Sequence, residues 1–177
     1  MRRGTKRSGQ RTSPVPHRYG RGGGRTWRIG FVDASYDGFV NANESATAEL
    51  PDGGLHFHAR DQHGTSPGNH ADAYSADDGR SLARPYAPQP ALDAMPVVQA
   101  GLLRLPGPDG PLLYSGPSAP DRRVALALWA SRDGGRTATR TLTLSARPAA
   151  SPYESIEFRR VPLATAAGTP STGAPSG

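Results

Sequence analysis

The chain carries the stretch Ser-Ala-Asp-Asp-Gly-Arg-Ser at residues 75–81, and 56 residues later the related stretch Ser-Arg-Asp-Gly-Gly-Arg-Thr at residues 131–137. A second related pair lies upstream, at residues 50–57 and 105–114, with the first leucines 55 residues apart. A weaker copy at residues 20–26 has Gly in place of the Ser and the Asp. Motifs that recur in step at one period indicate that a supersecondary unit has been copied.

The repeated stretch has the composition of a tight turn between two strands. Oxygens of Ser and Asp side chains accept hydrogen bonds from N–H groups of the turn, and Gly readily adopts a positive φ. We therefore interpret the matched positions as structural turn residues and not as catalytic ones. They are Ser75, Asp77 and Gly79 in the first copy and Ser131, Asp133 and Gly135 in the second.

Between these turns the sequence predicts short strands that form a small antiparallel sheet in each repeat. Four short strands in a repeat of roughly 40–60 residues are typical of a propeller blade. The predicted fold is all-β, a partial β-propeller of about two and a half blades over residues 19–163. The predicted strands span residues 44–50, 54–60, 70–74, 97–105, 111–115, 123–130, 138–144 and 154–161.

Composition excludes several classes of protein. The 177 residues include 22 Gly, 18 Pro and no Cys, and 35% of them are hydrophobic. The longest apolar run, residues 124–130, is far shorter than the ~20 residues of a membrane-spanning helix, so no membrane partner is expected. No stretch keeps a helical period for three turns without Gly or Pro, which argues against a long-helix bundle. Without Cys there are no disulfides and no thiolate metal sites.

The formal net charge of +6 is unevenly distributed along the chain. Residues 1–28 hold nine of the 21 basic residues and no acid, so the remainder has 12 basic against 15 acidic residues, a net charge of −3. A basic tail binds phosphates without sequence preference, but the lack of interleaved aromatic residues favours an unstructured leader, and we expect no nucleic-acid partner. We expect disordered segments at residues 1–18 and 164–177. No apolar segment follows the basic residues as in a secretory signal, and the localisation stays open.

The repeated turns resemble the Asp-box repeats of the sialidases (neuraminidases), here of the bacterial exo-α-sialidase type, which fold as six-bladed β-propellers. Residues 43–61 look like the Asn-Glu … Leu-x-Asp-Gly … Arg hairpin of that family. Residues 115–131 resemble a loop and strand that carry another active-site arginine, and residues 154–161 resemble the final strand. The resemblance implies the C-terminal part of such a propeller, truncated in front and with an internal deletion.

The hairpin at residues 43–61 permits a geometric prediction. If residues 51–53 form a three-residue loop, facing residue numbers sum to 104, and Glu44 faces Arg60 across the two strands. On spacing alone, such a pair is an ion pair on a half-buried sheet, worth about 0.2–1 kcal/mol. The resemblance implies a functional role for it instead.

Sialidases hydrolyse terminal α-linked sialic acid with retention, using a Tyr nucleophile that a Glu activates. Arginines bind the sialic acid carboxylate, because the guanidinium fork offers paired, charged donors. By position, Glu44 matches the activating glutamate and Arg60 matches the second arginine. Arg123 matches the third arginine, with Arg122 as the alternative, and Tyr153 is the candidate nucleophile. The implied partner is a sialylated glycan, and no cofactor is expected.

Three expected functional positions of the family have no direct match in this sequence. They are the first arginine, in an Arg-Ile-Pro segment, the general-acid aspartate, and the nucleophilic Tyr near residue 151, for which Tyr153 is the substitute. The sequence therefore predicts an incomplete catalytic domain. Two alternatives stay open: an inactive propeller remnant that binds acidic glycans without cleaving them, and a truncated pseudogene product.

Four histidines raise the question of a metal site. His56 and His58 alternate onto one face of a predicted strand, with His63 and His70 further along the chain. No Cys or carboxylate lies at ligand spacing from them in the sequence. We therefore interpret them as surface or substrate-side histidines and predict no metal.

Overall fold

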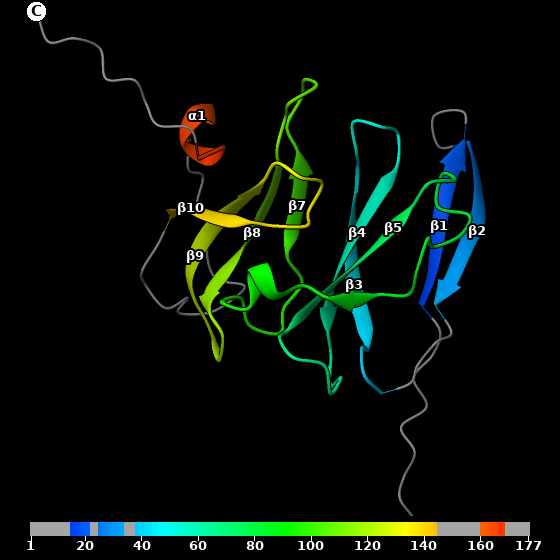
Figure 1. Ribbon diagram of the computed structural model, residues 1–177, viewed down its shortest axis with the longest axis horizontal. Coiled ribbons are helices and arrows are strands. Elements are labelled where there is room, and N and C mark those ends of the chain that lie inside the picture. Colours follow the sequence, from blue (N-terminus) through cyan, green and yellow to red (C-terminus); the bar gives the residue numbers. More distant parts are fainter. Residues whose placement is uncertain (1–14, 22–24, 34–37, 145–159, 169–177) are drawn as a thin grey trace, which may run out of the picture.

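A computed structural model describes residues 15–21, 25–33, 38–144 and 160–168, which form ten strands in three antiparallel sheets, with two short helices (Figure 1). The strands are β1 (Val15–Arg21), β2 (Thr26–Asp33), β3 (Ala42–Glu49), β4 (Leu55–Asp61), β5 (His70–Ser75), β6 (Ala87–Pro88), β7 (Gly101–Arg104), β8 (Leu112–Ala119), β9 (Arg122–Ser131) and β10 (Thr139–Thr143). The helices are η1 (Pro90–Leu92) and α1 (Leu163–Ala166). Neither of these helices is long and apolar enough to cross a membrane. The all-β prediction is confirmed.

The two four-stranded sheets are meanders with strand orders β3-β4-β5-β6 and β7-β8-β9-β10. Each contains one copy of the sequence repeat. The first strands of the two sheets, β3 and β7, contact one another. The hairpin β1-β2 forms a separate two-stranded sheet on the far side of the first meander (Figure 1). This arrangement places three copies of a related unit side by side, the first of them incomplete.

Seven of the eight predicted strands are present with shifted ends. The prediction missed β1, β2 and the two-residue β6, although Trp27, Ile29 and Phe31 alternate along β2 within a Gly- and Arg-rich segment. The predicted strand 154–161 lies mostly outside the described residues, and Arg160 and Val161 precede α1 without forming a strand. The expected domain boundary after residue 18 falls inside β1, and the boundary after residue 163 falls inside α1.

The β3–β4 hairpin follows the predicted register except at its open end. Leu50 and Gly54 close the three-residue loop, with a hydrogen bond from Leu50 N to Gly54 O of 2.7 Å. Ala46 faces His58 as expected, but Asn43, not Glu44, faces Arg60. Glu44 occupies a β-bulge between Asn43 and Ser45, with a φ of +44°. The prediction that Glu44 faces Arg60 was therefore wrong by one position, because a bulge adds a residue to one strand only.

The first Asp-box turn is held by two side chains. Ser75 Oγ accepts a hydrogen bond from Gly79 N (3.0 Å) and donates one to Asp77 Oδ1 (2.7 Å). Asp77 also accepts hydrogen bonds from the backbone N and the hydroxyl of Ser81, at 2.9 and 2.6 Å. These hydrogen bonds, the Ser81 hydroxyl first, lower the pKa of Asp77 to about 2.

The second Asp-box turn repeats this arrangement. Ser131 Oγ accepts from Gly135 N (2.9 Å) and donates to Asp133 Oδ1 (2.8 Å). Asp133 accepts from Thr137 N and Thr137 Oγ1, at 2.9 and 2.6 Å. Burial raises the pKa of Asp133, but the hydrogen bonds from Thr137 and Ser131 outweigh burial, and the net shift is downward.

The main apolar core lies between the two four-stranded sheets and under η1. Its buried residues are Leu92, Met95, Val98, Ala100, Leu112, Tyr114, Ala127 and Trp129. The outer face of the second meander is covered by α1, whose Ala166 packs with Leu113 and Ala130. Thr141 Oγ1 donates a hydrogen bond to Ala166 O (3.0 Å) and fixes α1 on this face. This short helix therefore covers part of the outer face of the second meander.

Candidate functional site

Glu44 and Arg60 form an ion pair at the open end of the β3–β4 hairpin. Arg60 Nε lies 2.9 Å from Glu44 Oε2. The Arg60 side chain is 15% exposed and the Glu44 side chain is 44% exposed. The bulge moves Glu44 out of register but leaves its carboxylate within reach of Arg60. The structure therefore brings these two candidate residues together by a different backbone path from the predicted one.

Two amide side chains hold this pair in place. Arg60 Nη2 donates a hydrogen bond to Gln62 Oε1 (2.5 Å), which also accepts one from Asn43 Nδ2 (2.7 Å). Asn43 Oδ1 accepts a hydrogen bond from the backbone N–H of Glu44 (2.8 Å), so the bulged residue has a partner for its N–H. The sequence analysis did not single out Gln62, although it lies two residues after Arg60. The result is a half-buried guanidinium, braced from one side, beside an exposed carboxylate.

Arg123 and Arg122 lie at the start of β9, and both are exposed. Arg122 Nε lies 3.5 Å from Asp121 Oδ1. Asn69 Nδ2 donates to Pro120 O (3.3 Å) and so joins the β4–β5 turn to the β8–β9 turn. Both turns, and the Glu44–Arg60 pair, therefore lie at the same end of the sheets (Figure 1).

The remaining candidates are not assembled with the pair. Within the described part of the chain, no hydrogen bond or ion pair joins Arg123 to Glu44 or Arg60. Tyr153, the candidate nucleophile, lies outside the described residues. The structure thus brings together two of the four residues expected to act on a substrate.

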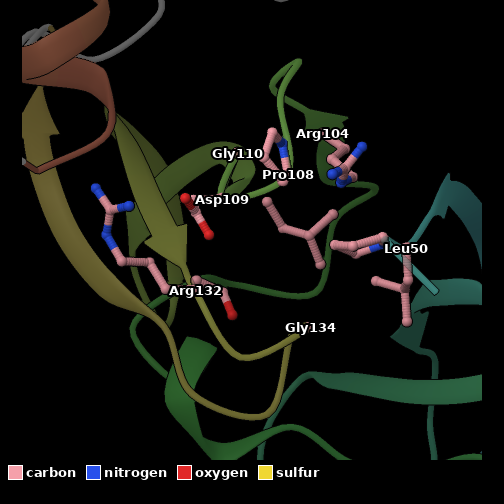
Figure 2. Close-up of a pocket in the computed structure, with 10 residues that line it drawn as sticks. Leu50, Arg104, Pro108, Asp109, Gly110, Arg132 and Gly134 are labelled. Atoms are coloured by element: carbon pink, nitrogen blue, oxygen red, sulfur yellow. The ribbon is translucent and has the colours of Figure 1, made fainter.

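A cavity of about 230 Å³ lies at the other end of the sheets (Figure 2). It is bounded by the β3–β4 turn at Leu50, the β7–β8 turn and the second Asp-box turn at Gly134. Its charged lining residues are Arg104, Asp109 and Arg132. Among the described candidates, Glu44, Arg60 and Arg123 do not line it.

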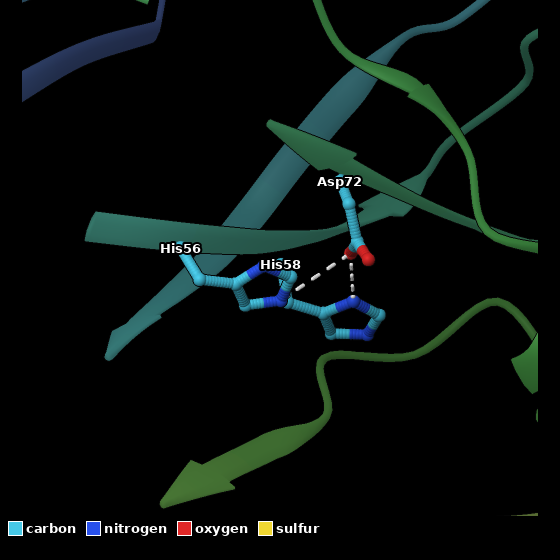
Figure 3. Close-up of side chains that lie close together, drawn as sticks. All are labelled: His56, His58 and Asp72. Carbon is cyan, nitrogen blue, oxygen red and sulfur yellow. Dashed lines mark hydrogen bonds and ion pairs between the residues drawn. The ribbon is translucent and has the colours of Figure 1, made fainter. Parts of the chain in front are cut away.

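The histidines of β4 and β5 form a buried cluster between the two meanders, contrary to the surface position that we expected. His56, His58 and His70 are 0%, 1% and 1% exposed, whereas His63 is exposed. His58 Nδ1 lies 2.6 Å from Asp72 Oδ1 on the facing strand, and His56 Nε2 lies 3.7 Å from the same oxygen (Figure 3). The carboxylate that was not apparent at ligand spacing along the chain is therefore supplied by strand pairing.

Residues from the rest of the interface complete this cluster. The Tyr114 hydroxyl lies 3.1 Å from His56 Nε2, and Gln89 Nε2 donates hydrogen bonds to Asp72 Oδ2 and to Gly135 O. His70 stacks on His58 with ring centroids 4.9 Å apart. Burial lowers the pKa of His56 and of His70 to about 4. Burial also raises the pKa of Tyr114.

Comparison with known proteins agrees with this geometry. The model of the BNR repeat-like domain family matches residues 5–160. The structure of "Hadza microbial sialidase Hz136" resembles this chain with a TM-score of 0.56 and 29% sequence identity. The match covers 71% of this chain and 24% of the sialidase, so the chain spans about a quarter of that protein's length. None of the curated proteins compared with the chain matches it.

These matches confirm the partial β-propeller and the sialidase-like character of its repeats. The two meanders with their Asp-box turns are blades of the kind that the sialidase contains, and they do not close into a ring by themselves. The family match extends over most of the chain. This chain is a sialidase-like member of the BNR repeat-like domain family.

Proposed function

We propose that this chain contributes part of a sialidase-type active site, which hydrolyses terminal α-linked sialic acid from glycoconjugates. The observation that carries this proposal is the Glu44–Arg60 ion pair, 2.9 Å between Arg60 Nε and Glu44 Oε2, at the open end of the hairpin. In this function Arg60 binds the sugar carboxylate, and Glu44 accepts the proton of a Tyr nucleophile. The relationship to the family and the 29% identity to a microbial sialidase support this assignment.

The geometry of the pair suits a carboxylate ligand. Gln62 accepts a hydrogen bond from Arg60 Nη2 and the Glu44 carboxylate forms an ion pair beside Nε, so the guanidinium is oriented before the substrate arrives. A guanidinium fork binds planar carboxylates through paired, charge-assisted hydrogen bonds. Arg123, at the same end of the sheets, is the second carboxylate-binding residue in this proposal, and Tyr153 is the nucleophile.

A second candidate function is binding of acidic glycans without hydrolysis. The observation that favours it is the incomplete assembly of the site: among the residues that the structure describes, no hydrogen bond or ion pair joins Arg123 to the pair, and the chain spans a quarter of the sialidase that it matches. A single oriented arginine is sufficient for weak recognition of a carboxylate. Cleavage needs the nucleophile and the general acid as well.

Two measurements on the full chain test these functions together. Release of a fluorophore from a fluorogenic sialoside reports hydrolysis, and chemical-shift changes on adding sialyllactose report binding. We expect binding that Arg60→Ala abolishes and that Glu44→Gln leaves within about threefold, because the Gln side chain keeps an oxygen beside Arg60 Nε and Gln62 still binds Nη2. Any turnover of the wild type should fall at least 100-fold in Glu44→Gln, within the contribution of general-base catalysis.

The controls separate the two candidates. Arg80→Ala removes an exposed arginine far from the hairpin end and should leave both signals unchanged. Binding without turnover would select the glycan-binding function. Absence of both signals, or signals that Arg60→Ala leaves unchanged, would contradict both functions.

A further inference from the structure

The buried cluster between the meanders contains donor atoms in a metal-binding arrangement. One ligand atom from each of His56, His58 and Asp72 lies within 4.8 Å of the others. The two histidines project from the same face of β4, and Asp72 faces His58 directly on β5. Figure 3 shows both imidazole rings turned toward the Asp72 carboxylate. The donors therefore come from neighbouring central strands, which position them rigidly.

One carboxylate in this cluster is buried and needs a compensating positive charge. Asp72 is 5% exposed, and in the described part of the chain its recorded ion-pair partners are His56 and His58, with no Lys or Arg among them. A buried carboxylate is strongly unfavourable unless a positive charge compensates it. Either a proton on the histidine side or a metal cation supplies that charge.

The distances accommodate a small tetrahedral ion after a modest adjustment. Zinc bonds to N and O ligands are about 2.0–2.2 Å long, which places tetrahedral ligand atoms about 3.3–3.5 Å apart. His56 Nε2 lies 3.7 Å from Asp72 Oδ1 and 3.1 Å from the Tyr114 hydroxyl. The 2.6 Å contact between His58 and Asp72 is a hydrogen bond, and a metal ion would replace its proton.

We propose that His56, His58 and Asp72 bind a divalent transition-metal ion of the zinc type, buried between the two meanders. The Tyr114 hydroxyl oxygen is the fourth ligand. Two imidazoles and one carboxylate are N and O donors of the kind that zinc accepts, and the Tyr114 oxygen lies beside them, 3.1 Å from His56 Nε2. Because Tyr114 belongs to β8 and the other ligands to β4 and β5, the metal ion links the two four-stranded sheets.

The surroundings of the site support this assignment. Gln89 donates to Asp72 Oδ2 and leaves Oδ1 directed at the histidines. Such a hydrogen bond orients a ligating carboxylate, as in known metal centres. Gln89 Nε2 also donates a hydrogen bond to Gly135 O (2.6 Å), so the same side chain connects the site to the second Asp-box turn.

The proposed metal ligands are different residues from the Glu44–Arg60 pair. His56 and His58 meet Tyr114 of the second meander, whereas Glu44 and Arg60 form an ion pair at the open end of the hairpin, where Arg60 faces His70. The ion would act on stability, since metal binding to the folded state is linked to folding. Its loss should not remove the Glu44–Arg60 pair.

The test uses the full chain, freed of metal with a chelator and then equilibrated with ZnCl₂. After gel filtration we expect about one Zn²⁺ per chain, and a melting temperature several degrees above that of the chelator-treated protein. MgCl₂ is the control cation, because Mg²⁺ prefers octahedral oxygen sites. Co²⁺ in place of Zn²⁺ should give the intense visible absorption of a tetrahedral complex.

Variants assign the ligands. Asp72→Asn keeps the size of the side chain and should remove the retained Zn²⁺, as should His58→Ala. His63→Ala removes an exposed histidine and should retain the ion. Gln89→Leu should weaken binding about 10–100-fold. Tyr114→Phe should weaken binding and remove the tetrahedral Co²⁺ spectrum, and an unchanged spectrum would overturn the assignment of the fourth ligand.

Wild-type measurements keep the proposal falsifiable if the variants fail to fold. No retained Zn²⁺ together with no change in melting temperature would overturn it. Equal retention of Zn²⁺ by wild type, Asp72→Asn and His58→Ala would also overturn it, since the ion would then be bound elsewhere. Weaker binding at lower pH is expected, because the metal competes with protons for its ligands.

Discussion

The two faces of β4 differ in chemistry although both are buried. On one face Phe57 packs edge-on against Phe31 of β2, with ring centroids 5.0 Å apart. On the other face His56 and His58 meet Asp72 and Tyr114, so polar side chains lie beside the apolar core between the meanders. Strand alternation separates the two sets, because neighbouring side chains of a strand point to opposite faces. The interface with the β1–β2 hairpin (the apolar interface) is apolar at this point, whereas the interface between the meanders (the polar interface) adds directed hydrogen bonds to its apolar core.

The matching carbonyl of each Asp-box turn accepts a hydrogen bond at its interface, from a backbone N–H in one case and a side-chain amide in the other. Gly79 O of the first Asp-box turn accepts a hydrogen bond from Phe31 N at 3.1 Å. Gly135 O, the matching atom of the second turn, accepts one from Gln89 Nε2 at 2.6 Å. The repeat thus conserves a carbonyl that docks on the preceding sheet, while the donor and the side chains around it vary. The Asp-box turn determines the docking geometry, and the side chains of the strands determine the chemistry of each interface.

The apolar interface should be the more sensitive to truncation. Phe57→Ala leaves a cavity at a fully buried position and should lower the free energy of unfolding by about 3–5 kcal/mol, measured by urea denaturation. Phe39→Ala is the matched control, since Phe39 is 48% exposed and its loss should cost about 1 kcal/mol or less. Equal losses for the two variants would show that the β1–β2 hairpin does not bury Phe57 in solution.

The polar interface should be the more sensitive to added volume. A Cβ on Gly135 would lie 2.6 Å from His56 Cε1 and 2.8 Å from the Tyr114 hydroxyl, at a φ of +95°. Strain and overpacking together should cost Gly135→Ala about 2–4 kcal/mol in urea denaturation.

Gly134→Ala separates the backbone contribution from the clash. Gly134 has a φ of +72° and its Cβ would meet Arg136 Nη1 only at 3.5 Å, so about 1–2 kcal/mol is expected. The first turn has Asp78 at the matching position with a φ of +60°, which shows that a side chain fits there. A loss for Gly134→Ala as large as that for Gly135→Ala would contradict the close approach to His56.

Removing the Ser hydroxyl tests whether the two Asp-box turns contribute alike. Ser131 is buried, and Ser131→Ala leaves the N–H of Gly135 without its acceptor, which should cost about 1–3 kcal/mol. Ser75→Ala makes the same change at Gly79, and a similar loss in thermal or urea unfolding is expected. A much smaller loss at Ser75 would mean that the first turn is held mainly by the β1–β2 hairpin.

The sequence predicted the copied features well and the unique ones poorly. The 56-residue repeat located both turns, and alternation located seven strands, because both signals are local. The register of the β3–β4 hairpin was predictable as far as Ala46 and His58, since the loop determines it. The bulge at Glu44 was not, because it depends on the side chain of Asn43.

The histidine cluster shows the main limit of prediction from this sequence. The strand pattern placed His56 and His58 on one face, but the face was assigned to solvent. Burial depends on Tyr114, which is 58 residues away from His56 in sequence. The carboxylate depends on the pairing of β4 with β5, which places Asp72 opposite His58. Neither contact has a local signal, so the cluster became visible only in the assembled sheets.

Acid should weaken both Asp-box turns in the same pH range. The loss of stability should be smaller than that caused by any of the substitutions above. Hydrogen bonds from Ser81 and Ser75 lower the pKa of Asp77 to about 2, and the pKa of Asp133 is also lowered. The folded state therefore binds these protons less readily than the unfolded state, in which an Asp titrates near 3.8. Stability should be fully present above about pH 4 and should decline as the pH falls toward 2.

The double variant Asp77→Asn, Asp133→Asn isolates this contribution. It removes both titrating groups while keeping side chains that accept hydrogen bonds, so its urea midpoint should change less between pH 4 and 2 than that of the wild type. The two single variants should each remove part of the pH dependence, because the turns have the same hydrogen-bond pattern. If only Asp133→Asn alters the profile, the two turns are equivalent in geometry but not in stability, and the polar interface alone couples its turn to the fold.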